Sequence, residues 1–127
     1  MILALGDNER SDVMDNSILN TAKKLIGSEG CEHFDTDIII HTNTALMVLN
    51  QLGVGPEGFS IEDETATWDE FTADKKVLPL VKSYVPLKVK IIFDPPTSSV
   101  VMEAINATLS ELEWRIQNAV ETKENDS

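Results

Sequence analysis

The stretch Asp35–Leu52 reads DTDIIIHTNTALMVLNQL, and its apolar residues repeat at helical spacing. With each residue advancing about 100° around a helix, one group falls within an arc of about 80°: Ile38, Thr42, Ala45, Leu49 and Leu52. A second group covers most of the remaining circumference: Ile39, Ile40, Leu46, Met47 and Val48. The sequence therefore predicts a helix that is either central in its domain or covered by a partner. Asp35 or Thr36 is expected to cap this helix, and Gly53 to close it.

Three further helices are expected around this one. A first helix begins near residues 15–17, stops at Gly27 and buries one stripe: Ile18, Leu19, Ala22, Leu25 and Ile26. Pro79 suits the first turn of a third helix with Val81, Tyr84, Val85 and Ile92 inward, which Pro86 is expected to kink or cut. Residues 94–99 stop that helix and cap a last one, whose stripe leaves Trp114 outside: Met102, Ile105, Leu109, Leu112, Ile116 and Val120.

Residues 53–73 form a long stretch between the second and third helices that is too aromatic for a flexible linker. Its large apolar side chains either fold back on the chain's own core or dock on another chain: Phe59, Ile61, Trp68 and Phe71. Short strands are expected at Ser60–Ile61 and Thr65–Trp68. The fold class predicted is mainly α, a small bundle of about four helices with this long irregular loop.

The composition fits one compact domain of 127 residues with a net charge of −12. We expect an N-terminal extension at 1–13, a helical domain at 14–120 and a flexible acidic tail at 121–127. A single cysteine, Cys31, fits a reducing compartment, and no apolar run approaches the roughly 20 residues needed to span a bilayer. The acidic surface is expected to repel nucleic acid and anionic lipid.

The charges are divided into two blocks along the chain. The acidic block, residues 28–74, contains no lysine or arginine, whereas the basic block, residues 75–90, contains no acid. The lysines of the basic block are Lys75, Lys76, Lys82, Lys88 and Lys90. Either the two blocks neutralise each other within one fold, or they lie on separate faces that meet across a subunit boundary.

No enzyme signature emerges from the sequence. The glycine-rich run Gly53–Gly58 has a proline in its middle and lacks the strand and helix that a phosphate-binding loop requires. Cys31, His33 and His41 carry ligand-type side chains but not zinc-site spacing. We therefore expect no catalytic residue, no metal and no cofactor.

An ordered set of motifs resembles the head-tail connector, or adaptor, proteins of tailed bacteriophages with long non-contractile tails. The resemblance extends from about Asn16 to Ile116 and is carried by these segments: Asp37–His41, Leu49–Pro56, Phe59–Asp63, Thr67–Trp68, Tyr84–Val85, Leu87–Val89 and Phe93–Ser99. It implies a non-enzymatic protein of the virion, made in the bacterial host cytoplasm. Such a protein docks as a twelvefold ring on the portal protein at the capsid vertex.

The same resemblance implies the partners: the portal, neighbouring copies in the ring, and the next connector or stopper protein. Double-stranded DNA would pass through the ring without specific binding. Residues expected at subunit boundaries come from the aromatic loop and the basic block: Phe59, Ile61, Trp68, Phe71, Lys75, Lys76, Lys82 and Lys90. Residues expected to dock on the portal lie on the last helix: Trp114, Arg115 and Val120.

Two alternatives come from other classes of protein. An acidic helical inhibitor or antitoxin would bind a basic target one to one and form no ring. A small metal-dependent hydrolase built on Cys31, His33 and His41 would contain stoichiometric zinc.

Overall fold

Helices make up most of the chain in the computed structural model, which describes residues 16–27 and 33–126. They are α2 (Ile18–Ile26), α3 (Asp35–Gln51), the short α4 (Trp68–Phe71), α5 (Leu78–Phe93) and α6 (Ser99–Asp126). The described residues contain no β-strand, only an isolated bridge between Ser17 and Thr67. The prediction of a small, mainly α bundle is confirmed. The strands expected at Ser60–Ile61 and Thr65–Trp68 are wrong, because Trp68 begins α4 instead.

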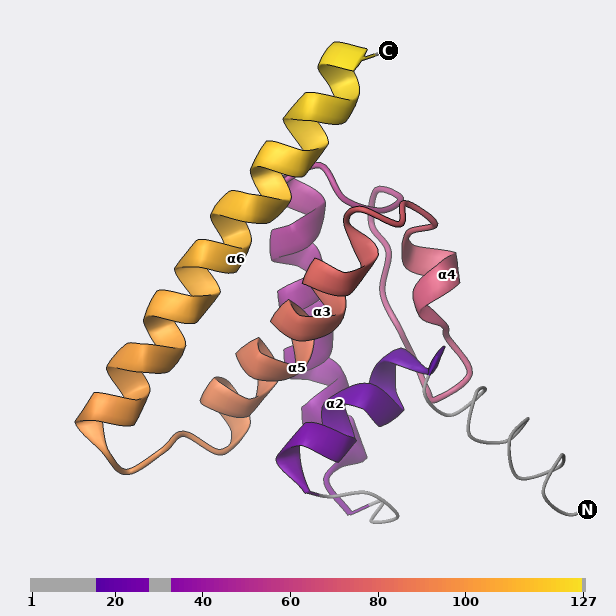
Figure 1. Cartoon of the computed structure of the whole chain (residues 1–127). Helices are drawn as coiled ribbons and strands as arrows, with labels where there is room; N and C mark the ends of the chain where they lie inside the picture. The colour runs from indigo at the N-terminus through magenta and orange to yellow at the C-terminus, as the bar shows by residue number, and fades with distance from the viewer. Residues whose placement is uncertain (1–15, 28–32, 127) are drawn as a thin grey trace, which may run out of the picture.

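Helix α5 lies at the centre and packs against α2, α3 and α6 (Figure 1). Its inward side chains are completely buried: Val81, Tyr84, Val85 and Val89. Pro86 neither cuts the helix nor ends it. Proline removes one backbone hydrogen bond, but Pro86 is buried and the turns on both sides of it are anchored in the core by Val85 and Val89. Ile92, expected to face inward, is exposed.

The first described helix, α2, has the ends that the sequence predicts. The Ser17 Oγ accepts a hydrogen bond from the Asn20 backbone N–H at 3.3 Å, and Gly27 ends the helix at a φ of 86°. Leu25 is 46% exposed, contrary to expectation. Lys23 is buried instead, and its ammonium lies 2.8 Å from a carboxylate oxygen of Asp35, at the start of α3.

Helix α3 buries the predicted stripe, with Ile38, Thr42, Ala45 and Leu49 inaccessible to solvent. Its start differs from the expectation, since Phe34 occupies the N-cap position and makes no side-chain cap hydrogen bond. Asp35 and Thr36 lie inside the first turn. Asp35 is the ion-pair partner of Lys23, so its carboxylate joins two helices rather than capping one.

Helix α6 is the longest helix and leans against the bundle, with its C-terminal end standing clear of the other elements (Figure 1). Ser98 caps its start, because the Ser98 Oγ accepts a hydrogen bond from the Val101 backbone N–H at 3.3 Å. Leu109 and Ile116 of the predicted stripe are buried in the core. The helix continues to Asp126 and so includes residues that the sequence assigns to a tail.

Candidate assembly surfaces

The aromatic loop folds back on the chain's own core. Ile61, Trp68 and Phe71 are buried, and Phe59 is half-buried with its ring centroid 5.2 Å from that of Phe71. The Trp68 Nε1–H donates a hydrogen bond to the Thr21 Oγ1 at 3.1 Å, so the indole ties the loop to α2. Of the two arrangements open at the sequence level, folding back is the one observed for these side chains.

Hydrogen bonds fix this loop along α2 and α3. The Asn43 side chain makes two bonds with Ile61, donating to its carbonyl at 3.0 Å and accepting from its N–H at 2.7 Å. Ser17 donates to the Glu64 carbonyl at 2.7 Å, and the Ile18 N–H donates to the Ala66 carbonyl at 3.1 Å. The backbone between these anchors is therefore held in place, with the side chains of Glu62, Asp63 and Glu64 exposed beside α3.

Asp63 organises the turn within this acidic segment. Its carboxylate accepts hydrogen bonds from the Thr65 hydroxyl and from the Thr65 backbone N–H, the latter at 2.8 Å. Both bonds favour the ionised form, the hydroxyl bond more strongly, and they lower the pKa of Asp63 below its ordinary value. The two bonds therefore hold the Asp63 carboxylate in its ionised form.

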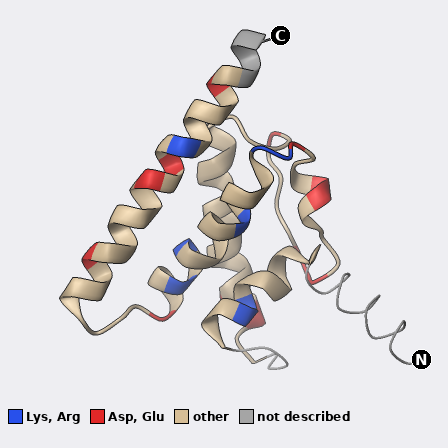
Figure 2. Cartoon of the chain, in the orientation of Figure 1, with Lys and Arg blue, Asp and Glu red and all other residues tan. Residues whose placement is uncertain are grey.

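The basic block lies along the start and the outer side of α5 (Figure 2). Lys75 and Lys76 are exposed just before the helix, and Lys82 and Lys90 are half-buried on it. Lys90 lies 3.8 Å from the carboxylate of Asp94. Across the described ranges, no lysine of this block forms an ion pair with an acid of the acidic block. The two blocks do not neutralise each other by direct pairing there.

The portal-docking candidates on α6 differ in how they are presented. Trp114 is 65% exposed, whereas Arg115 pairs with Glu111 one turn earlier at 2.8 Å. Val120 is half-buried, and a Cβ built on Gly53 would lie 3.0 Å from its Cγ1 atom. Val120 therefore seats α6 against the loop that follows α3, and Trp114 is the large apolar side chain that α6 turns outward at this end.

A polar contact in the core joins α6 to α5. The Tyr84 hydroxyl is buried without a hydrogen bond of ordinary geometry, and the Glu113 carboxylate of α6 acts on it electrostatically. Burial is the larger cause and Glu113 the smaller, and together they raise the pKa of Tyr84 well above its usual value. Tyr84 is therefore held in its neutral, protonated form in the folded protein.

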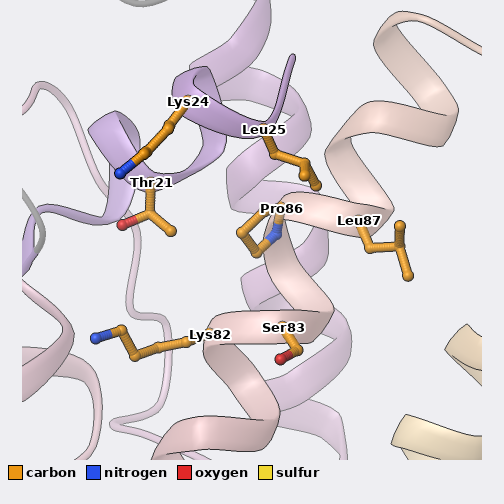
Figure 3. Close-up of a pocket in the computed structure, with 7 residues that line it drawn as sticks. All are labelled: Thr21, Lys24, Leu25, Lys82, Ser83, Pro86 and Leu87. Atoms are coloured by element: carbon orange, nitrogen blue, oxygen red, sulfur yellow. The ribbon is translucent and has the colours of Figure 1, made fainter. Parts of the chain in front are cut away.

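A groove of about 480 Å³ lies between α2 and α5 (Figure 3). We call it the α2–α5 groove, and its lining is mainly apolar with lysines at its edges: Thr21, Lys24, Leu25, Lys82, Ser83, Pro86 and Leu87. Sequence reasoning missed it, since it placed Leu25 in the core and took Pro86 as a helix breaker. Lys82 is the one predicted interface residue that lines it.

The residues considered for metal chemistry do not form a site in the described part of the chain. No group of three potential ligands from His, Cys, Asp and Glu comes together there. His33 packs on Phe34 at 4.8 Å between ring centroids, and His41 packs near Phe93 at 6.4 Å. Cys31 lies outside the described residues. None of the described helices has the length and apolar content needed to cross a bilayer.

A known protein family matches most of the chain. The family model described as phage connector protein matches residues 18–123, which extend from the start of α2 into the last turns of α6. No curated protein and no solved structure matches the chain. The match includes nearly all of the helical bundle and the whole of the aromatic loop and of both charge blocks, and so the chain belongs to the phage connector protein family.

Proposed function

We propose that this protein is the head-tail adaptor of a tailed phage, which binds the portal at the capsid vertex and joins it to the next connector or stopper protein. The observation that carries the proposal is the family match over residues 18–123, which includes every helix from α2 to α5 and most of α6. Membership of a phage connector family supports a structural role in the virion. The acidic-inhibitor alternative has no comparable support.

Copies of the chain form a ring, with twelve copies as the expected number. A ring requires two different faces of one chain that complement each other. The separation of the acidic loop from the lysines of α5, without ion pairs between the two blocks, supports such an arrangement. Lys75, Lys76, Lys82 and Lys90 lie on the surface or half-buried and remain candidates for subunit contacts.

The portal contact is assigned to the C-terminal half of α6. Ile116 packs this half of the helix in the core, and Trp114 on its other side exposes an apolar surface of the kind that anchors protein interfaces. The last turns of the helix extend past the bundle (Figure 1). Arg115 adds a charged group whose carboxylate partner, Glu111, is on the same helix. Val120 acts indirectly, by holding α6 against Gly53.

The net charge of −12 suits a ring whose channel wall does not bind the DNA that passes through it, because acidic side chains repel phosphate. Assembled rings are therefore expected to show no tight DNA binding at moderate salt. Retention of DNA on the rings under those conditions would contradict this part of the proposal.

The test is co-elution of the full chain with the portal encoded beside it in the same genome. Wild type is expected to co-elute, and Trp114→Ala to reduce the bound fraction at least tenfold. Asn106→Ala, an exposed site on the same helix, serves as the control and should bind as wild type. A chain ending at Val120 tests whether residues 121–127 take part. Failure of wild type to co-elute would refute the portal role, and unchanged binding of Trp114→Ala would move the contact elsewhere.

A further inference from the structure

The outer face of α3 carries two large exposed apolar side chains, and its one acid, Asp37, lies in the first turn. No Asp, Glu, Lys or Arg occurs from residue 38 to residue 56, in a chain where a quarter of all residues are charged. Ile40 is 55% exposed and Met47 is 54% exposed. They lie seven residues apart, with exposed Thr44 between them, and so they share one side of the helix. We call Ile40, Thr44, Met47 and Gln51 the α3 outer face.

This face points away from the core. Ile38, Ala45 and Leu49, which alternate with it along the helix, are completely buried. The helix packs with that buried side on α5 and α2. After Asp37 this face has no charged side chain, and exposed Ile and Met on it, in a chain of this charge, mark a contact surface rather than a solvated one.

The α2–α5 groove opens on the opposite side of the bundle. In Figure 3, which looks into the groove, α3 passes behind α5, so α5 separates the groove from α3. The lining of the groove is mainly apolar and includes Leu25, Pro86 and Leu87. The molecule thus presents an apolar ridge on one side and an apolar groove on the other.

The charges beside the two surfaces are of opposite sign. Exposed Glu62 and Asp63 lie next to α3, because Asn43 of α3 holds Ile61 through two hydrogen bonds. Lys82 lines the groove, is half-buried and has no ion-pair partner in the described ranges. An acidic edge on the ridge and a lysine on the groove attract each other when two copies meet in one orientation and favour that register.

We propose that the occupant of the α2–α5 groove is a second copy of this chain, which inserts its α3 outer face. Ile40 and Met47 of one copy pack on Leu25, Pro86 and Leu87 of the next. Because the ridge and the groove lie on opposite sides, the contact is head-to-tail and repeats from copy to copy. This inference rests on the proposed function, because it names the contact between neighbouring copies of the adaptor. The same contact is expected between copies of the chain when the portal is absent.

The test uses disulfide formation between copies, in a Cys31→Ser background that removes the natural thiol. A double variant, Met47→Cys with Leu87→Cys, carries one thiol on each surface, and the two thiols of one chain are kept apart by the bundle. On mild oxidation it is expected to give a ladder of covalent multimers on a non-reducing gel. Each single variant has one thiol and gives dimers at most. Met47→Cys with Asn106→Cys, which moves the second thiol to exposed α6, is the matched control and should give no ladder.

The oxidation is run on the concentrated chain alone and on the chain mixed with its portal. A ladder in either sample that the control lacks supports the contact. Absence of the ladder from both samples, or an equal ladder from the control, overturns it. If the portal is captured without a ladder, the portal role survives and the contact proposed here is wrong. If a ladder forms without portal capture, the contact between copies is supported and the portal role is wrong.

A photoreactive cross-linker attached at the Leu87→Cys thiol identifies the occupant of the groove without requiring a lysine there. Mass spectrometry of the covalent dimer isolated from a gel is expected to find the peptide that contains Ile40 and Met47 joined to the probe. Cross-links confined to the portal, or to the N-terminal residues of the same chain, would overturn the proposal. Ile40→Glu, added to the double-cysteine variant, places a charge on the exposed ridge. It is expected to remove the ladder at every size above dimer while leaving the far-UV circular dichroism spectrum unchanged.

Discussion

The two tryptophans of this chain test how the aromatic loop is held. Trp68 is completely buried and bonded to Thr21, whereas Trp114 is largely exposed. A buried tryptophan removes about 200 Å² from water, which at about 25 cal/mol per Å² amounts to about 5 kcal/mol. Mutational data for Phe or Trp to Ala give roughly 3–5 kcal/mol. We expect Trp68→Ala to lower the free energy of unfolding by about 4 kcal/mol, and Trp114→Ala by less than about 0.5 kcal/mol.

The assay is urea unfolding of the free chain, followed by far-UV circular dichroism because this signal does not depend on indole fluorescence. Since a domain of this size has a total stability of roughly 5–15 kcal/mol, Trp68→Ala risks leaving too little folded protein to measure. Trp68→Phe keeps most of the apolar volume and loses the bond to Thr21, with an expected cost of about 1–2 kcal/mol. If Trp68→Ala cost no more than Trp114→Ala, the loop would not be packed in the free chain, and its aromatic residues would be docking groups instead.

Three further predictions follow from single features. Gly55→Ala is expected to cost at least about 2 kcal/mol more than Gly58→Ala in urea unfolding, since both have positive φ but only a Cβ at Gly55 meets the Phe71 ring; equal costs would contradict this packing. Thr65→Ala should raise the pKa of Asp63 in an NMR titration, because the hydrogen bond from the Thr65 hydroxyl is the main cause of the lowered pKa. Stability supplied by Asp63 is present at neutral pH and lost as pH falls through its lowered pKa; an unchanged pKa would refute the assignment. Assembly on the portal should weaken from 50 to 500 mM salt, because screening shortens the reach of exposed charges; salt-insensitive assembly would remove the charge blocks from the interface.

Helix positions were predictable from the sequence because periodicity and end signals agree along most of the chain. Ser17, Gly27, Pro79 and Ser98 each mark a helix end by a local mechanism that needs no knowledge of the rest of the fold. The helical spacing of the stripe from Ile38 to Leu49 likewise predicted which side chains of α3 are buried.

Other features depend on tertiary context, and the sequence does not reveal them. Lys23 takes a buried position because Asp35, twelve residues later, is there to pair with it, and Leu25 is left at the surface. Helix α4 is a single turn held by Trp68 and Phe71 in the core, and its propensity alone would not form it. Pro86 stays helical because the packing around it outweighs one lost hydrogen bond.

The candidate surfaces were only partly predictable. The apolar circumference of α3 indicated a helix that is central or covered, and the structure shows one side buried and the other presenting Ile40 and Met47. The α2–α5 groove left no signal, since it is lined by side chains of two helices that lie far apart in the sequence. The large apolar side chains of the aromatic loop predicted burial but not its kind, because a protein core and a subunit interface both bury such side chains. Burial in the folded chain distinguishes the two for Ile61, Trp68 and Phe71.

The measurement that tests the adaptor role most directly is native mass spectrometry of this protein, alone and mixed with the portal encoded beside it. The account predicts one defined complex in which the number of copies of this chain matches the symmetry of the portal, with twelve expected. A protein that stays unbound in the presence of an intact portal would contradict the account, and family membership would then describe its fold and not its place in the virion.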